Sequence, residues 1–134
     1  MAMSHENVEL AHRALDSFNR RDSDGFLAVQ AENVRADPRL AAVEGGYHSH
    51  DGIRRWWKSL FDGIPDFTMD VVEVRDLADD LVLAVAHSRG HGAESATPFE
   101  DTIWVPIRFR RGKAVWWGVF LTEGEALEAA GLSE

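Results

Sequence analysis

The fold of this chain is decided by a stretch near its C-terminus, IWVPIRFRRGKAVWWGVFL, residues 103–121. Large apolar side chains recur at every second position on both sides of its centre, which is the periodicity of β-strands. The centre itself, RRGK, has a glycine where a tight turn can require a positive φ angle. The stretch therefore predicts a β-hairpin, with one strand over residues 99–109 and the next over residues 114–121.

Two further strands are expected before this hairpin. Apolar residues alternate with polar ones from residue 67 to residue 74, with an irregularity at Val71 and Val72. Asp79 and Asp80 then turn the chain into a long strand over residues 81–91.

The N-terminal half has helical periodicity instead. Apolar residues recur at steps of three and four over residues 7–20, and again in a short second helix that Asp22 caps and Asn33 closes. A brief extended segment over residues 34–37 and an irregular stretch over 38–50 precede a third helix, which opens at His50 or Asp51 and ends at Gly63. A short helix over residues 123–130 closes the chain. Helices followed by an antiparallel meander predict an α+β protein, with three N-terminal helices packed on an antiparallel sheet.

The composition fits one globular domain over residues 1–134. Hydrophobic residues make up 45% and charged residues 28%, ordinary values for such a domain. The net charge of −9 opposes binding to nucleic acid or to anionic membranes. The absence of cysteine excludes disulfides and cysteine-ligated metals. The N-terminus lacks the apolar core of a signal peptide, and no apolar run is long enough to span a membrane, so we expect a cytoplasmic protein.

The alternation of side chains also predicts a pocket. On the strands over residues 99–109 and 114–121 the odd-numbered apolar residues share one face, which we expect to face the helices; the same parity is applied to residues 81–91. Together with two tryptophans of the third helix, this face predicts a pocket for a small hydrophobic molecule, lined by Trp56, Trp57, Val85, Val105, Ile107, Trp117 and Val119.

Ionisable residues of the same parity stand at one end of this face. His87, Arg89 and His91 lie on one strand and Asp101 on the next, so we expect them at the rim of the pocket. His87 or Arg89 would then polarise a substrate oxygen, and Asp101 would hold that polarising side chain in place. The alternative is that these residues only form ion pairs with neighbouring carboxylates.

The even-numbered face carries large rings. Trp104, Trp116 and Phe120 alternate with the pocket residues, and we expect no later segment to be long enough to cover them. Exposed apolar surface of this size favours association. We therefore expect a homodimer through these three residues.

Four segments taken together resemble the SnoaL-like branch of the nuclear-transport-factor-like superfamily, which includes the ketosteroid isomerases. They are ENVELAHRALDSFNRRD (6–22), NVRADP (33–38), GYHSHDGIRRWW (46–57) and RFRRGKAVWWGVFLTEGEALEAAG (108–131). The resemblance implies a cone-shaped roll enclosing a pocket. It also makes Asp37, before Pro38, similar to the general base of ketosteroid isomerases. The two oxyanion donors of those enzymes would fall at Ala14 and Val105, and neither has a donor to offer.

Other chemistry is less favoured by the sequence. His48, His50 and Asp51 form a short cluster that could suggest a metal, but His50 is better explained by the start of the third helix. There is no phosphate-binding loop or dinucleotide fingerprint. We expect neither a metal nor a cofactor.

Three hypotheses follow from the sequence. The first is a pocket for a small organic ligand with cofactor-free proton transfer, of the isomerase, cyclase or hydratase type, in which Asp37 stands at the wall of the pocket and is the base. The second is a binding module that uses the same pocket without catalysis. The third is an interaction domain whose tryptophan-rich face is the whole function. A base and donors that converge inside the pocket would favour the first hypothesis over the second.

Overall fold

The computed structural model describes residues 2–39, 45–92 and 98–132, and confirms the predicted α+β class. The elements in chain order are α1 (Ala2–Asn19), α2 (Ser23–Ala28), β1 (Gln30–Pro38), β2 (Tyr47–His48), α3 (Ser49–Gly63), β3 (Thr68–Ala78), β4 (Leu81–His91), β5 (Pro98–Arg110), β6 (Lys113–Val119) and α4 (Glu123–Ala129). Asp22 caps α2 as predicted, with its side chain accepting the backbone N–H of Gly25. The strand β2 was not predicted, and β1 is longer than the expected extended segment.

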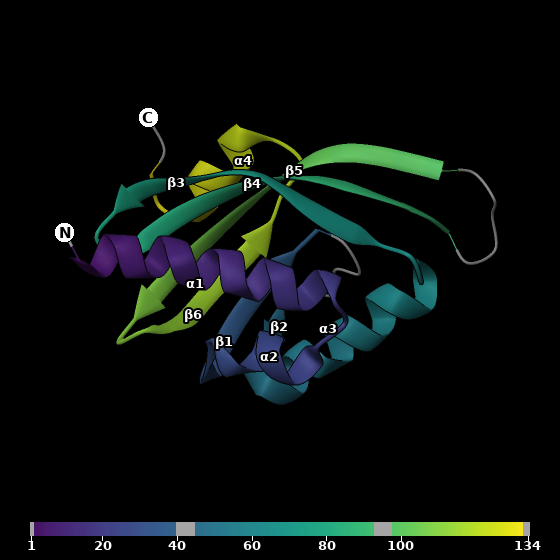
Figure 1. Cartoon of the computed structure of the whole chain (residues 1–134), viewed down its shortest axis with the longest axis horizontal. Coiled ribbons are helices and arrows are strands. Elements are labelled where there is room, and N and C mark those ends of the chain that lie inside the picture. Colours follow the sequence, from purple (N-terminus) through teal and green to yellow (C-terminus); the bar gives the residue numbers. More distant parts are fainter. Residues whose placement is uncertain (1, 40–44, 93–97, 133–134) are drawn as a thin grey trace.

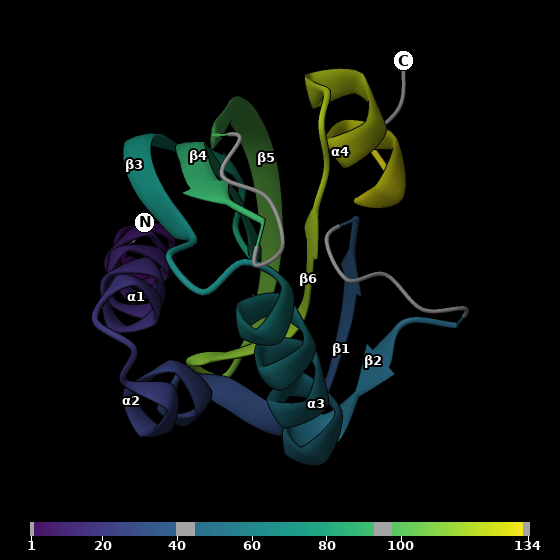
Figure 2. The same ribbon diagram turned by 90° about the vertical axis from the view of Figure 1, so that its right-hand side faces the viewer.

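The six strands form one curved sheet in the order β2-β1-β6-β5-β4-β3 (Figures 1 and 2). Neighbouring strands are antiparallel except β1 and β6, which run parallel, so the sheet is mixed rather than wholly antiparallel. The irregularity predicted in β3 is confirmed, since the register with β4 shifts between Val71 and Glu73. No described helix is long and apolar enough to cross a membrane.

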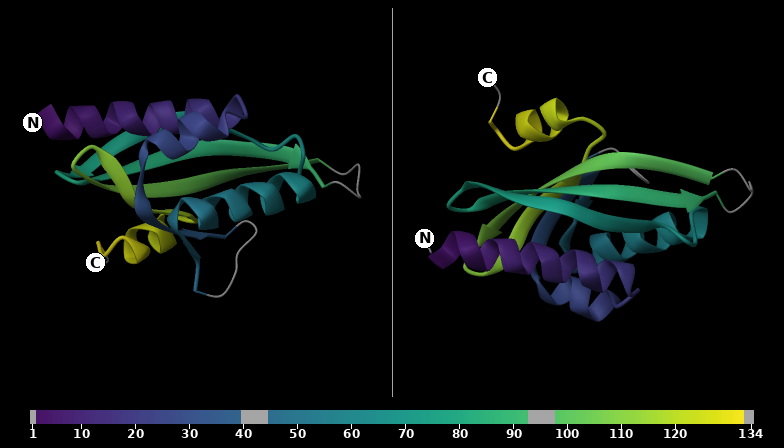
Figure 3. Two further views of the ribbon diagram at one scale, coloured as in Figure 1. Left: turned by 90° about the horizontal axis from the view of Figure 1, so that it is seen from below. Right: turned by 45° about the horizontal axis from the view of Figure 1, so that its top comes forward.

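The helices divide between the two faces of the sheet. The helices α1, α2 and α3 lie against the concave inner face, whereas α4 lies on the outer face (Figures 2 and 3). Each face therefore has its own apolar cluster. The inner cluster contains Phe18, Trp56 and Trp117, and the outer cluster contains Leu83, Trp116 and Phe120.

The predicted side-chain parity is right for two strands and wrong for β4. The odd-numbered residues of β5 and β6 pack in the inner cluster, as expected. On β4, however, the even-numbered Val82, Ala84 and Ala86 face inward. The pairing explains the change, because Ala84 lies opposite Val105 with no register shift in β4 and β5, and paired residues share a face. Small residues there also allow α1 to pack on β4.

The prediction that no later segment covers the outer rings is also wrong. Trp116 and Phe120 are 9% and 7% exposed and pack in one cluster with Ala126 and Ala130 of the C-terminal segment. Trp104 is half-buried at the edge of the same cluster. Because α4 already removes these rings from water, they give no support to a homodimer through Trp104, Trp116 and Phe120.

Candidate functional site

An apolar cavity lies between the inner face of the sheet and the helices. Its volume is about 30 Å³, and its lining comes from α1, α2, α3 and four strands. The lining residues are Ala14, Leu15, Phe26, Val29, Gln30, Trp56, Met69, Val105, Ile107, Phe109, Ala114, Trp117 and Val119. None of these described residues is ionisable.

Five of the predicted pocket residues line this cavity and two do not. Trp56, Val105, Ile107, Trp117 and Val119 are in its wall. Trp57 lies instead at a separate surface hollow between α2 and α3. Val85 is buried on the outer face, opposite Trp104, because of the parity of β4.

Three aromatic rings form one wall of the cavity. The rings of Trp56 and Trp117 meet edge to face, with centroids 5.0 Å apart and planes at 70°. Phe26 lies 6.2 Å from Trp56 and 6.1 Å from Trp117, measured between centroids. These are favourable geometries for aromatic packing, so the wall is a defined surface of ring faces and edges.

A buried amide holds one of these rings. The indole N–H of Trp117 donates to Oε1 of Gln30 at 2.8 Å, and Nε2 of Gln30 donates to the carbonyl oxygen of Phe26 at 3.1 Å. Gln30 is only 4% exposed. Both hydrogen bonds are thus shielded from water and fix the indole plane at the cavity wall.

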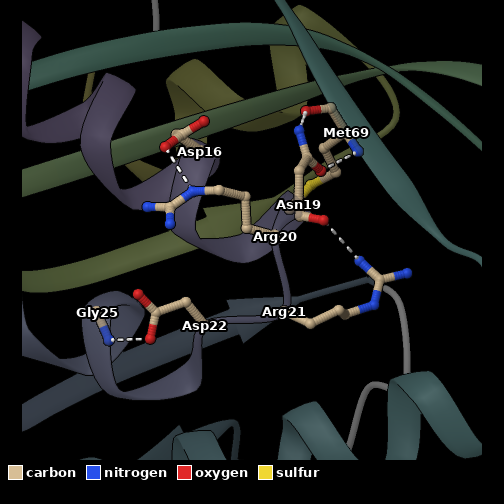
Figure 4. A network of polar contacts seen from close by, with 7 residues as sticks. All are labelled: Asp16, Asn19, Arg20, Arg21, Asp22, Gly25 and Met69. Carbon is tan, nitrogen blue, oxygen red and sulfur yellow. Dashed lines mark hydrogen bonds and ion pairs between the residues drawn. The ribbon is translucent and has the colours of Figure 1, made fainter.

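A second amide fixes the part of the wall that β3 contributes. Asn19, at the end of α1, donates from Nδ2 to the carbonyl oxygen of Met69 at 2.8 Å and accepts the backbone N–H of Met69 at 2.9 Å (Figure 4). This double contact ties α1 to β3. It therefore sets where the Met69 side chain enters the cavity.

Several lining residues are not predicted by the sequence, for identifiable reasons. Gln30 falls inside the predicted second helix, although α2 ends at Ala28 and Gln30 begins β1. The alternation predicts Met69 as a strand residue but not as a cavity residue. Ala14 and Ala114 are too small to stand out in a search for bulky faces.

Asp37 lies on the other face of the sheet from the cavity. Its Oδ2 accepts the indole N–H of Trp116 at 2.8 Å and a guanidinium N–H of Arg35 at 3.2 Å. Its side chain is 37% exposed and lines an outer hollow with Arg39, His48 and Phe120. The expectation that Asp37 stands at the wall of the tryptophan-lined pocket is therefore wrong.

The other predicted catalytic residues are not brought together. His87 and Arg89 lie on the outer face of β4, where they pair with Glu100 at 3.4 Å and Asp70 at 2.7 Å. Asp101 is exposed and lies opposite Ser88, whose side chain faces inward. The prediction that these groups share one cavity fails because alternate residues of a strand point to opposite faces.

His91 contacts the carboxylate of Asp66 through two of its nitrogen atoms. Its Nδ1 lies 2.8 Å from Oδ2 of Asp66, and its backbone N–H donates to Oδ1 at 2.9 Å. These hydrogen bonds lower the pKa of Asp66 below its ordinary value. The pair lines a solvent-open hollow of about 300 Å³ with Arg89 and Phe99.

The two histidines at the start of α3, His48 at its N-cap and His50 in its first turn, contact backbone carbonyl groups. His48 Nε2 lies 2.9 Å from the carbonyl oxygen of Gly45, and His50 Nε2 lies 2.9 Å from that of Gln30. Within the described ranges, no three His, Cys, Asp or Glu residues are grouped closely enough to hold a metal ion.

A family model for the SnoaL-like domain matches residues 11–117. The chain belongs to the SnoaL-like domain family. The matched segment runs from the middle of α1 to Trp117, so it includes every residue that lines the inner cavity except Val119.

Solved structures of low identity share the fold of this SnoaL-like domain. An NTF2-like protein of unknown function from Burkholderia pseudomallei K96243 matches with a TM-score of 0.79 and 19% identity, covering 92% of this chain and 95% of that one. TerC, co-crystallised with polyporic acid, has a TM-score of 0.78 and 17% identity, covering 92% and 98%. A protein of ketosteroid isomerase-like fold from Catenulispora acidiphila, in complex with trimethylamine, has a TM-score of 0.76 and 15% identity, covering 92% and 93%. Comparison with curated proteins gives no match.

Proposed function

We propose that this SnoaL-like domain binds a small apolar molecule in the cavity between its sheet and helices, without supplying an acid or base there. The observation that carries the proposal is the lining of the cavity. Aromatic and aliphatic side chains surround it, and no ionisable group of the described lining residues faces it. Concave apolar sites of this kind are the usual place for small ligands.

The cavity has to widen when a ligand enters. Its volume of about 30 Å³ is far below the roughly 150 Å³ of an engineered cavity that holds benzene. Met69 is the lining residue best suited to move, because its unbranched side chain changes rotamer easily. A fixed backbone at Met69, held by Asn19, with a mobile side chain would let the wall yield without disturbing β3.

The geometry favours binding over proton transfer with Asp37 as the base. A general base must lie within hydrogen-bond reach of the proton that it removes. Asp37 is on the outer face, where its carboxylate holds Trp116 and Arg35. The aromatic wall and Asp37 therefore do not act on one ligand in the inner cavity.

Toluene is a suitable probe for the inner cavity, with intrinsic tryptophan fluorescence and thermal unfolding as readouts. A ligand that binds only the folded state stabilises it by about 2.7 kcal/mol at a hundred times its Kd. We expect toluene to raise the melting temperature and to change the emission of the tryptophans at the cavity wall. An apolar cavity that takes no ligand would leave both unchanged.

Two matched alanine variants locate the site. Ala114→Val adds two methyl carbons to the cavity wall, whereas Ala78→Val makes the same change at an exposed position of the edge strand β3. We expect Ala114→Val to weaken toluene binding by about tenfold or more, since the added carbons occupy the ligand's space. Ala78→Val should bind as the wild type does. Equal binding by the two variants would place toluene elsewhere and overturn the proposal.

A further inference from the structure

We propose that Gln30 determines which ligands the inner cavity accepts, by turning hydrogen-bonding groups away from it. This inference rests on the ligand site proposed above and goes further, because it names a ligand class. The part of the ligand that enters the cavity is a hydrocarbon group without a hydrogen-bonding atom.

The side chain of Gln30 links two polar groups near the cavity. It lies where α2 gives way to β1 and is 4% exposed. Its oxygen accepts the indole N–H of Trp117, and its nitrogen donates to the carbonyl oxygen of Phe26. One side chain thereby occupies a donor from β6 and an acceptor from α2.

The chemistry of the partners fixes the orientation of the amide. An indole N–H can only donate and a backbone carbonyl oxygen can only accept. A flipped amide would set its NH₂ group against the N–H of Trp117 and its oxygen against the carbonyl oxygen of Phe26. The observed orientation is therefore the one that satisfies both partners, and Trp117 presents its ring rather than its N–H to a ligand.

The energy of an unpaired buried donor explains why this affects selectivity. A buried N–H without an acceptor costs about 1–3 kcal/mol, so an indole freed from Gln30 would favour any ligand that brings an oxygen. With Gln30 in place, an oxygen atom in the cavity loses its water without gaining that partner. Gln30 is thus a specificity-determining residue for the proposed binding site.

Toluene and phenol test this directly, because a methyl group and a hydroxyl group are close in size. We expect the wild type to bind toluene about tenfold or more tightly than phenol. In Gln30→Leu the toluene preference should fall by about fivefold or more, since phenol can then accept the indole N–H of Trp117. Ala78→Val, at an exposed position of β3 outside the cavity, serves as the control and should keep the wild-type ratio.

A second variant covers the case in which Gln30→Leu does not fold. Trp117→Phe removes the indole N–H and leaves the Gln30 oxygen available to the phenol hydroxyl, so the toluene preference should fall here too. If the ratio of toluene to phenol affinity stays at the wild-type value in the folded variants, the role of Gln30 is overturned and the proposed function still stands. No binding of toluene to the wild type would overturn the proposed function and this inference with it.

Discussion

Trp116 and Trp117 are neighbours on β6, yet their rings lie on opposite faces of the sheet and in different apolar clusters. Each indole N–H donates at 2.8 Å to a side chain of β1. The acceptor is the neutral amide of Gln30 on the inner face and the carboxylate of Asp37 on the outer face. The same type of side chain therefore has a neutral hydrogen-bond acceptor on the inner face and a charged one on the outer face.

The two environments differ in their access to water. Gln30 is 4% exposed, whereas the side chain of Asp37 is 37% exposed and also contacts Arg35. Moving a charge out of water costs several kcal/mol, which a single indole N–H would not offset. An amide suits the inner face because it accepts the hydrogen bond without that cost. The inner face can thus remain uncharged beside the cavity.

The largest effect on stability is expected from disrupting the packing of α4 on the outer face of the sheet. Ala126 of α4 is fully buried against the outer cluster, so Ala126→Asp would place an unpaired carboxylate there. We expect a loss of about 3 kcal/mol in the free energy of unfolding, measured with urea. Ala129→Asp, at an exposed position of the same helix, is the control and should change stability little. Similar losses in the two variants would mean that α4 does not shield the outer rings from water.

The next effect concerns the inner partner. Gln30→Leu leaves the indole N–H of Trp117 buried without its acceptor, and the expected loss is about 2 kcal/mol. Urea unfolding gives the magnitude, and near-ultraviolet circular dichroism reports whether the Trp117 ring loses its fixed environment. A loss below about 0.5 kcal/mol would show that the amide contributes little beyond its volume.

The same substitution on the outer face should have a smaller effect. Asp37→Leu removes the acceptor of Trp116 and the partner of Arg35, but water can reach this site and replace both contacts. We expect a loss below about 1 kcal/mol, as for other exposed ion pairs. If Asp37→Leu cost as much as Gln30→Leu, the contrast between the two faces would be wrong.

The smallest effect is expected at the rim, where the contact of Asp66 with His91 is exposed. Because folding lowers the pKa of Asp66, its contribution to stability is present above the unfolded pKa and is lost as the pH falls through the lower folded value. The difference in melting temperature between the wild type and Asp66→Asn should therefore be small near pH 6 and shrink below about pH 4. A difference that grew on acidification would contradict this sign.

The order of the helices and strands could be predicted from the sequence because it depends on local periodicity. Which side chains of β4 point to the inner face could not be predicted, since this depends on which residue of β4 lies opposite Val105. The rule that bulky residues face the helices failed because Leu81 and Leu83 are bulky and pack toward α4 instead. A helix of seven residues looked too short to matter by sequence, yet it gives the outer face its own core.

The candidate site could be predicted only in its larger side chains. Trp56, Ile107 and Trp117 are predicted because their size and the local periodicity, helical for Trp56 and alternating for the other two, mark them in the sequence. The role of Gln30 depends on an acceptor meeting an indole 87 positions away in sequence, and no local pattern encodes such a contact. The ionisable residues misled the prediction because charge alone does not tell which face of a strand they occupy.

The contact between Asn19 and Met69 also protects an open edge of the molecule. β3 is the last strand of the sheet, and an edge strand offers unpaired backbone groups to which a strand of another molecule can add. At Met69 the backbone N–H and carbonyl oxygen are both bonded to the amide of Asn19. At this position, a side chain that helps to shape the cavity wall also occupies the backbone groups to which an added strand would have to bond.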